Sequence, residues 1–291
     1  MFEGLSTALI TPFRDDAVDE PALRELVERQ IAAGVDQLVP CGSTGESATL
    51  SHIEHGRVIE IVVSASRGRI RVLAGTGSNN TREATELTQH AKAVGADGAL
   101  LISPYYNKPT QEGIYEHYRA IAEQTKFPLV TYNIPGRTGS NIAPSTLARL
   151  ADVPHIVAVK EACGDVGQIA EVVARCHEDF AVLSGDDALI LPIMAVGGKG
   201  AISTASNVAP EAVGELVRAC RDNDLARARK LHFQLLPLFD ALFFETNPIP
   251  VKCALEVMGL IESAEVRLPL TPITEANRDR LQVVLKELGQ L

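Results

Sequence analysis

Short apolar runs alternate with longer amphipathic segments along most of this 291-residue chain, and this alternation constrains the fold more than any other feature. The runs are STALI, DQLVPC, IRVLAG, GALLI, FPLVTY, IVAVK, FAVLS and KGAIS. Continuous apolar runs of this length are typical of parallel strands that are buried on both faces. Eight such units, each about 25 to 30 residues long with its helix, predict an α/β fold that closes into a (β/α)8 TIM barrel.

The segments between the runs have the periodicity of helices. EPALRELVERQIAAG, TREATELTQHAKAVG, QEGIYEHYRAIAEQT and APEAVGELVRACRDN carry apolar residues at helical spacing, and several end at Gly or Asn. The eighth run ends near Ser203, and the tail is helical by period without a strand pattern. We therefore expect a catalytic barrel over residues 1–223 and an appended C-terminal helical region over residues 224–291. An open doubly wound sheet is the alternative, because periodicity does not report closure.

Composition and charge exclude several classes of function. The formal net charge is −10 and no run of Lys or Arg occurs, which argues against a nucleic-acid partner. No apolar run approaches the roughly 20 residues of a membrane-spanning helix, and the N-terminus does not resemble a signal peptide. We expect a cytoplasmic protein without membrane contact. The five cysteines are scattered without a C-x-x-C pair, which predicts reduced thiols rather than disulfides or a zinc site.

Polar residues follow most of the apolar runs, where a barrel gathers its loops on one face. These exits read GSTGES at 42–47, GTGSNN at 75–80, SPYYN at 103–107, TYNIPGRTG at 131–139, KE at 160–161, SGDD at 184–187 and STAS at 203–206. Hydroxyls, tyrosines, one arginine and one lysine in such a set predict covalent amine chemistry. No metal site is predicted, since the close pair His52 and His55 lacks a zinc-site pattern.

Lys160 is the main candidate nucleophile because it ends the apolar run at 156–159. Burial disfavours the ammonium form, and the free amine can attack a ketone to form an iminium without a cofactor. The same pattern fits a surface lysine at the end of a strand. The rival lysines, Lys199 and Lys252, are expected outside strand interiors.

Seven longer stretches carry a set of motifs that recurs in one family. They are TALITPF, PCGSTGESATLSHIEH, SPYYNKPTQEGIYEHY, YNIPGRTG, VAVKEACGD, LSGDDALILPIMAVGGKGAIS and ETNPIPVKCAL. Together they resemble the dihydrodipicolinate synthase family of the pyruvate-dependent class I aldolases. The resemblance implies a lyase that needs no cofactor and condenses pyruvate with L-aspartate 4-semialdehyde in the diaminopimelate route to lysine.

The resemblance also implies roles for individual residues. Lys160 would form the Schiff base with pyruvate, and Tyr132, Thr44 and Tyr106 would form a hydroxyl relay that moves protons. The tyrosine matching Tyr105 would reach across a subunit interface beside Tyr106, within a homotetramer made of two tight dimers.

Substrate-binding residues follow from the same resemblance. The backbone around Ser43 and Thr44 would hold the pyruvate carboxylate, Gly185 and Ile202 would line the pocket near the imine, and Arg137 would bind the carboxylate of the aldehyde substrate. Two positions depart from the family: Ser43 stands where many members have threonine, and Cys253 stands where an aromatic residue often occurs. Neither departure removes a catalytic group.

Feedback inhibition by L-lysine is a further implication of the resemblance. The matching residues are Ser47, Ala48, His52, His55, Asn79, Glu83 and Tyr105, at the tight dimer interface. Glu83 can pair with a ligand ammonium, while Asn79 and Tyr105 can hydrogen-bond a carboxylate. Taken singly, His52, His55 and Glu83 are more often solvated residues of a helix face.

Two other functions fit part of the pattern. An N-acetylneuraminate lyase or a 2-keto-3-deoxy sugar acid aldolase would keep GSTGE, Tyr132 and Lys160, but NIPGRTG with Arg137 argues against it. A non-catalytic ligand-binding barrel is the other alternative, and the presence of Lys160, Tyr132 and Thr44 argues against that.

Overall fold

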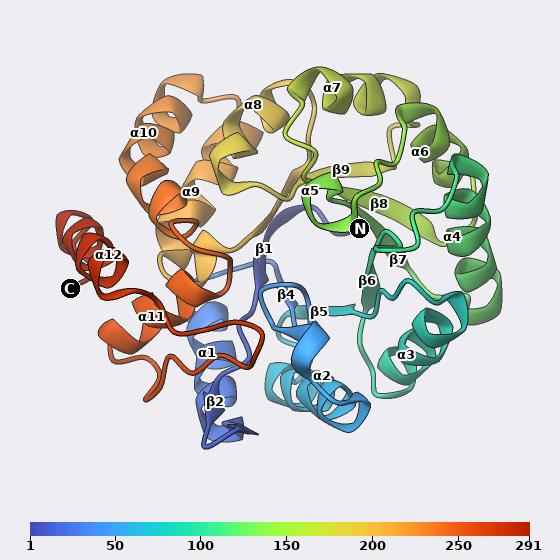
Figure 1. Ribbon diagram of the computed structural model, residues 1–291. Helices are drawn as coiled ribbons and strands as arrows, with labels where there is room; N and C mark the ends of the chain where they lie inside the picture. Colours follow the sequence, from blue (N-terminus) through green and yellow to red (C-terminus); the bar gives the residue numbers. More distant parts are fainter.

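The eight apolar runs form eight parallel strands that close into a barrel in the computed structural model, which describes residues 1–291 (Figure 1). The strands are β1 (Gly4–Ala8), β4 (Gln37–Val39), β5 (Arg71–Gly75), β6 (Gly98–Ile102), β7 (Leu129–Asn133), β8 (Ile156–Glu161), β9 (Ala181–Ser184) and β10 (Gly200–Ser203). Each strand pairs with its neighbours in chain order, and β1 closes the ring by pairing with β10. The predicted barrel is confirmed, and the open sheet is excluded.

Two glycines permit the closure between β1 and β10. Gly4 lies opposite Gly200 in the parallel register, and their φ angles are +87° and +157°. A Cβ atom on Gly200 would lie 2.1 Å from the carbonyl oxygen of Gly4. Residues with a side chain would force the two strands apart at this point.

Helices surround the barrel and follow the strands along the chain (Figure 1). They are α1 (Glu20–Ala32), α2 (His52–Ser66), α3 (Thr81–Ala93), α4 (Gln111–Thr125), α6 (Pro144–Ala151), α7 (Val166–Arg175), α8 (Ile190–Ala195) and α9 (Pro210–Arg221). Side chains cap several helix starts; Ser51 and Glu54, for example, form a capping box on α2. A hairpin of β2 (Phe13–Arg14) and β3 (Ala17–Val18) precedes α1, and the short α5 (Pro135–Thr138) follows β7.

The C-terminal region is helical, as predicted. It contains α10 (Leu225–Ala241), α11 (Ile249–Val257) and α12 (Glu275–Glu287). α10 packs against α9, and α12 packs against both α10 and α11 on the outside of the barrel (Figure 1). None of the helices combines the length and the apolar character that crossing a bilayer requires.

Apolar side chains fill the interior of the barrel, and Phe2 belongs to this inner core. The inner cluster comprises Phe2, Ala8, Val39, Leu73, Leu100, Val130, Tyr132, Ala158, Ala181, Leu183 and Ile202. Phe2 is fully buried, and its ring lies so close to β6 that a Cβ on Gly98 would come within 2.5 Å of Phe2 Cζ. The N-terminus therefore lies within the ring of strands when the barrel is viewed along its axis (Figure 1).

We predict that Phe2→Ala destabilises the protein by about 3 to 5 kcal/mol, because it removes a fully buried ring and leaves a cavity. Denaturant unfolding followed by circular dichroism measures the loss. The control is Val283→Ala on α12, since Val283 is 55% exposed and little should change. Equal stability of the two variants would show that Phe2 does not contribute to the core.

Candidate active site

Lys160 and Tyr132 lie side by side at the carboxyl ends of β8 and β7. The parallel register pairs the two residues, so both side chains point to the same face of the sheet. Lys160 Nζ lies 4.2 Å from the centre of the Tyr132 ring, and both residues are buried. Lys160 is therefore not a surface lysine.

The charge state of Lys160 is set mainly by this burial. Burial lowers the pKa of Lys160 to about 8; the negative charge of Asp187 opposes the shift, and the positive charge of Arg137 adds to it. At pH 7 about a tenth of such an amine is uncharged, against fewer than about one in a thousand for a free lysine. The structure thus supplies a nucleophilic amine near neutral pH.

The three members of the predicted hydroxyl relay are not joined by hydrogen bonds within one chain. Thr44 Oγ1 accepts a hydrogen bond from Asn247 Nδ2 at 2.9 Å and lies 3.3 Å from Thr204 Oγ1. Tyr106 is 89% exposed, so its side chain lies in solvent rather than beside buried Tyr132. Burial raises the pKa of Tyr132 to about 12, which keeps its hydroxyl protonated.

The loop after β4 presents unpaired backbone donors. The N–H groups of Ser43 and Thr44 donate to no acceptor in the protein, whereas those of Gly45 and Glu46 close turns within the loop at 3.1 and 3.2 Å. Successive free N–H groups in a tight turn form a concavity that suits an anion. These two N–H groups lie in the loop where the resemblance implies a bound carboxylate, which stays a prediction.

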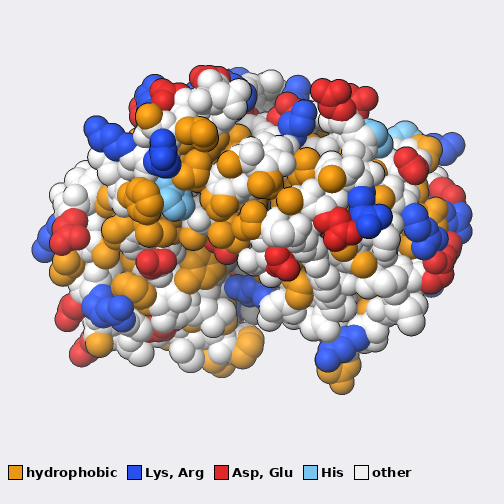
Figure 2. All heavy atoms as spheres, turned by 90° about the horizontal axis from the view of Figure 1, so that it is seen from above, with side chains coloured by type: hydrophobic (Ala, Val, Ile, Leu, Met, Phe, Trp, Pro, Cys, Tyr) orange, Lys and Arg blue, Asp and Glu red, His pale blue; other side chains and the backbone are white.

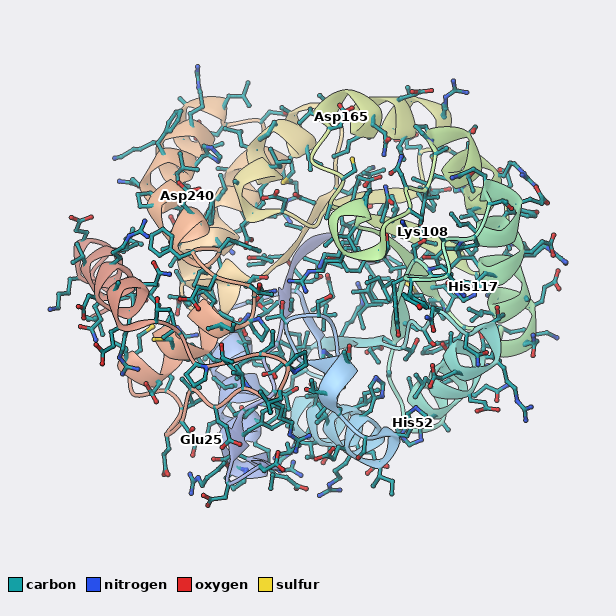
Figure 3. All side chains as sticks on the ribbon, in the orientation of Figure 1. Glu25, His52, Lys108, His117, Asp165 and Asp240 are labelled. Atoms are coloured by element: carbon teal, nitrogen blue, oxygen red, sulfur yellow. The ribbon has the colours of Figure 1, made fainter.

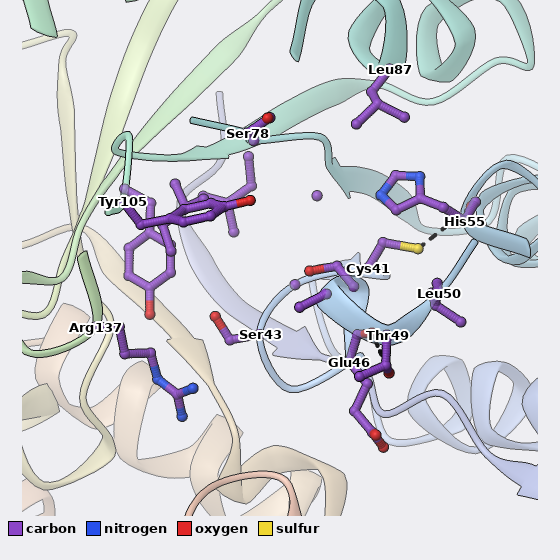
Figure 4. A pocket seen from close by; sticks show the side chains of 18 of the residues that line it. Cys41, Ser43, Glu46, Thr49, Leu50, His55, Ser78, Leu87, Tyr105 and Arg137 are labelled. Carbon is purple, nitrogen blue, oxygen red and sulfur yellow. Dashed lines mark hydrogen bonds between the residues drawn. The ribbon is translucent and has the colours of Figure 1, made fainter. Parts of the chain in front are cut away.

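A cavity of about 450 Å³ connects Tyr132, the neighbour of Lys160, with residues of the predicted lysine site. One end is lined by Ser43, Tyr132, Arg137 and Asn247, and the other by Ser47, Ala48, His52, His55 and Glu83. Tyr105 also lines it, and the side chains of Ser43, Tyr105 and Arg137 point toward a common space (Figure 4). Tyr105 therefore faces the cavity of its own chain, a contact that the resemblance did not imply.

The remaining substrate-binding candidates surround Lys160 and the cavity. Gly185 abuts the lysine: a Cβ there would lie 2.8 Å from Lys160 Cε, so a larger residue would displace the amine. Ile202 is buried in the inner core next to the barrel axis. Arg137 lies on α5, is exposed, and donates from Nη2 to the carbonyl oxygen of Asn247 at 3.1 Å.

The residues of the predicted lysine site come from α2, α3 and the adjoining loops. His52 lies at the start of α2 on the side facing α3 (Figure 3), and its Nε2 is 2.8 Å from Glu83 Oε1. Ser78 donates a short hydrogen bond to the other oxygen of Glu83, and Asn79 Nδ2 donates to the carbonyl oxygen of Tyr105 at 3.1 Å. Glu83 is thus already engaged by two neutral or weakly basic partners.

His55 is the buried member of this set. Burial lowers the pKa of His55 to about 4, so the imidazole is neutral at physiological pH. Its Nδ1 has no hydrogen-bond partner in the protein. A neutral ring with a free nitrogen can accept or donate one hydrogen bond at the cavity wall.

Asn133 and Glu161 form a second pair across β7 and β8, one residue beyond Tyr132 and Lys160. Because side chains alternate along a strand, this pair points away from the barrel axis. Asn133 Nδ2 donates to Glu161 Oε1 at 2.8 Å, and Asn133 Oδ1 accepts from the N–H of Ile142 at 3.0 Å. Asn133 therefore closes the loop that carries Arg137.

Sequence reasoning missed both this pair and Asn247. Asn133 and Glu161 directly follow the two catalytic candidates, so the alternation of strand side chains was a usable signal for them. Asn247 contacts both Thr44 and Arg137, but it stands 203 residues from Thr44 in the chain. No local pattern could have linked them.

A closed barrel with a buried lysine at the end of a strand, next to a cavity, defines the class of protein: an aldolase-like (β/α)8-barrel enzyme. A model described as the dihydrodipicolinate synthetase family matches residues 1–288. The chain belongs to this family. The family prediction made from the motifs is therefore confirmed, and with it the enzyme class.

Individual relatives agree over the whole chain. The 4-hydroxy-tetrahydrodipicolinate synthase of Nitratidesulfovibrio vulgaris strain DP4 is 57% identical over 291 residues, which cover 100% of this chain and 99% of that protein. Dihydrodipicolinate synthase from Acinetobacter baumannii, solved in complex with pyruvate, has a TM-score of 0.98 and 45% identity, covering 100% of both chains. DHDPS from Cyanidioschyzon merolae, solved with lysine bound, has a TM-score of 0.97 and 41% identity, covering 100% of this chain and 99% of that one.

We predict that Glu161→Gln stabilises the protein increasingly as the pH rises from about 5 to 7. Burial raises the pKa of Glu161 to about 7 and its Oε2 has no partner, so the folded protein binds this proton more tightly than the unfolded chain does. The cost of ionising Glu161 therefore grows between pH 4.5 and 7 and is constant above, reaching about 3 kcal/mol from the size of the shift. Glutamine keeps an acceptor for Asn133 without that cost.

Denaturant unfolding of variant and wild type at several pH values measures this difference. Glu178→Gln, at an exposed glutamate, is the control and should give no such trend. A difference for Glu161→Gln that does not change between pH 5 and 8 would show that Glu161 is ionised throughout.

Proposed function

We propose that this chain is a 4-hydroxy-tetrahydrodipicolinate synthase that condenses pyruvate with L-aspartate 4-semialdehyde on Lys160. The observation that carries the proposal is a buried amine, with a pKa of about 8, held beside the Tyr132 ring next to a cavity. Lys160 Nζ attacks the ketone carbon of pyruvate, and loss of water leaves an iminium. Its positive nitrogen lets the methyl group lose a proton and become the nucleophilic carbon of an enamine.

The second half of the reaction uses the aldehyde. The enamine carbon adds to the aldehyde carbon of the second substrate, whose oxygen takes up a proton. The substrate's own amino group then attacks the iminium carbon, closes the ring and releases Lys160 as a free amine. Tyr132, whose ring centre lies 4.2 Å from Lys160 Nζ, serves as the proton carrier for these steps in this proposal.

In this proposal the carboxylates of the two substrates bind at two different sites. The free N–H groups of Ser43 and Thr44 receive the pyruvate carboxylate, with Gly185 and Ile202 beside the imine. Arg137 takes the carboxylate of L-aspartate 4-semialdehyde through its guanidinium fork. The backbone oxygen of Asn247 orients that guanidinium.

We also propose that the working form is a homotetramer made of two tight dimers. Tyr106 is 89% exposed, and it can join the relay with Tyr132 and Thr44 only if its hydroxyl comes from a neighbouring chain. Hydrophobic side chains gather on the face where α8 and α10 lie (Figure 2), and the exposed residues there include Val196 and Phe233. Two distinct association surfaces of this kind support an assembly of more than two chains.

We propose that the boundary between residues 223 and 224 separates the barrel from its C-terminal extension, and that the two parts do not fold independently. Asn247, Lys252 and Arg267 of the C-terminal region all bond to the loop after β4, which carries Ser43 and Thr44. The barrel over residues 1–223 therefore supplies the amine, and residues 224–291 complete the wall of the site.

We predict that borohydride in the presence of pyruvate fixes a covalent adduct on Lys160, faster with rising pH up to about 8. The rate should rise about tenfold per pH unit below 8 and level off above it, because only the neutral amine attacks. Tryptic mass spectrometry locates and quantifies the adduct. Lys160→Arg should give none, and Lys199→Arg is the control that keeps it.

A coupled assay tests the full reaction. Turnover with pyruvate and L-aspartate 4-semialdehyde, and none with N-acetylneuraminate, is the expected result. Cleavage of N-acetylneuraminate would instead support a sugar acid aldolase. Wild-type protein that forms no pyruvate adduct would indicate a ligand-binding barrel.

Feedback inhibition by L-lysine is proposed for the other end of the cavity. Glu83 is there to receive an ammonium group, in place of His52 and Ser78, and His55 offers a neutral ring nitrogen. Tyr105 lines the same cavity and adjoins Tyr106 in the chain. A ligand at this end therefore contacts the segment that carries a relay tyrosine, which provides coupling between distinct sites.

We predict that millimolar L-lysine lowers the initial rate at saturating pyruvate, and that Glu83→Ala raises the half-inhibiting concentration about tenfold or more. The reason is the loss of a charge-assisted hydrogen bond to the ligand. Glu86→Ala is the matched control, since Glu86 lies one turn further along α3 and pairs with Arg82 in solvent. Equal inhibition of both variants would place the lysine ammonium elsewhere.

A further inference from the structure

A buried ion pair joins the loop after β4 to the C-terminal helices. Lys252 Nζ of α11 lies 2.5 Å from Glu46 Oε1, and the two side chains are 0% and 1% exposed. Lys252 also donates to the carbonyl oxygen of Glu265 at 2.7 Å and lies 4.0 Å from the centre of the Phe13 ring. The other oxygen of Glu46 accepts the backbone N–H of Arg267 at 3.1 Å.

Lys252 was considered above as an alternative nucleophile to Lys160, and its contacts exclude that role. Lys252 resembles Lys160 in that burial lowers its pKa to about 8. However, its side chain is 0% exposed and its nitrogen is enclosed by Glu46, Glu265 and Phe13, so no substrate can reach it. Buried ion pairs contribute little net stability, because desolvation offsets their attraction. The conformation of the loop after β4 indicates a role for the Glu46–Lys252 pair other than stability.

The loop is bounded by two residues in the left-handed backbone region. Cys41 has a φ of +57° and Glu46 a φ of +52°, and neither is a glycine. Such conformations are disfavoured for residues with a Cβ, and they persist only where the surroundings hold them. Between them stand Ser43 and Thr44, whose N–H groups are free because of the turn that these conformations produce.

Several contacts fix this loop from the C-terminal side, and the Glu46 pair is the most buried of them. Asn247 bonds to the hydroxyl of Thr44, and Arg267 Nη1 donates to the carbonyl oxygen of Thr49 at 3.1 Å. Glu46 itself turns its side chain away from the space between Ser43 and Arg137 (Figure 4). Its side chain is 1% exposed and its carboxylate is engaged by Lys252 and the N–H of Arg267, so it acts on Ser43 and Thr44 through the backbone that it holds.

We propose that the Glu46–Lys252 pair is a positioning device that holds the loop at residues 41–46 in its strained turn, so that the Ser43 and Thr44 N–H groups stay aimed at the pyruvate carboxylate. The inference rests on the proposed function and extends it to two residues that do not touch substrate. Glu46 of the GSTGE motif and Lys252 of α11 then act together, and the C-terminal region contributes to pyruvate binding through them.

The test compares Glu46→Gln, Lys252→Met and the double variant Glu46→Gln/Lys252→Met. Each single change leaves a buried polar group without its partner and should lower the melting temperature. The double change removes both charges and should recover much of that loss. Steady-state kinetics then give the KM for each substrate separately.

Positioning and mere stability predict different results for the double variant. If the pair positions the loop, the KM for pyruvate stays raised about tenfold, while the KM for the aldehyde changes by less than about threefold. If the pair only stabilises the fold, the recovered melting temperature brings the pyruvate KM back to wild type, which overturns the proposal. Phe2→Ala is the control for lost stability alone, and it should leave the pyruvate KM unchanged.

Two further measurements keep the outcome decisive. Should the double variant not fold, Glu46→Gln alone, which replaces one oxygen by an amide nitrogen, must still raise the pyruvate KM by about threefold or more, and an unchanged value overturns the proposal. Hydrogen exchange of residues 41–50 should accelerate in the same variant relative to the rest of the barrel. Failure of the wild type to form a pyruvate adduct on Lys160 would instead refute the proposed function.

Discussion

Closure of the barrel between β1 and β10 is the constraint on which the other features depend. It requires the backbones at Gly4 and Gly200 to approach more closely than any side chain allows. Once the ring is closed, the carboxyl ends of all eight strands converge on one end of the barrel. Residues from loops more than 200 positions apart, such as Thr44 and Asn247, then become neighbours. Toward the opposite end, the interior holds the buried ring of Phe2 and a hydrogen bond from Ser6 Oγ to Gln37 Oε1 at 2.6 Å.

The carboxyl ends of the strands bring buried polar side chains together at one end of the barrel. Hydrogen bonds on the helix-facing side of the sheet hold these side chains in place. Tyr132 and Lys160 face the interior, while their successors Asn133 and Glu161 bond to each other on the helical side. One hydrogen-bonded pair thus fixes the relative position of the two catalytic candidates without entering the cavity. Asn133 also ties down the segment that bears Arg137. Lys160, Tyr132 and Arg137 are therefore connected through one asparagine.

Much of the fold could be predicted because its signals are local. Each buried strand is a continuous apolar run, each helix has its own period, and Lys160 stands out as a charge at the end of such a run. The contacts that the sequence did not reveal join distant segments: Glu46 with Lys252, and Asn247 with Thr44. Periodicity reports the environment of a residue but not its partner. For Tyr106, the sequence could not distinguish a side chain in the site from one that projects 89% exposed from its own chain.

The charges around Lys160 also bear on the order of the proposed reaction. Asp187 favours positive charge on the nitrogen, and it acts alike on the ammonium and on the later iminium. Arg137 disfavours the ammonium, so the amine is most nucleophilic while that guanidinium has no anion beside it. A carboxylate bound first at Arg137 would neutralise this effect and return the lysine toward its protonated form. In the proposed reaction, this effect favours attack of Lys160 on pyruvate while no anion occupies Arg137.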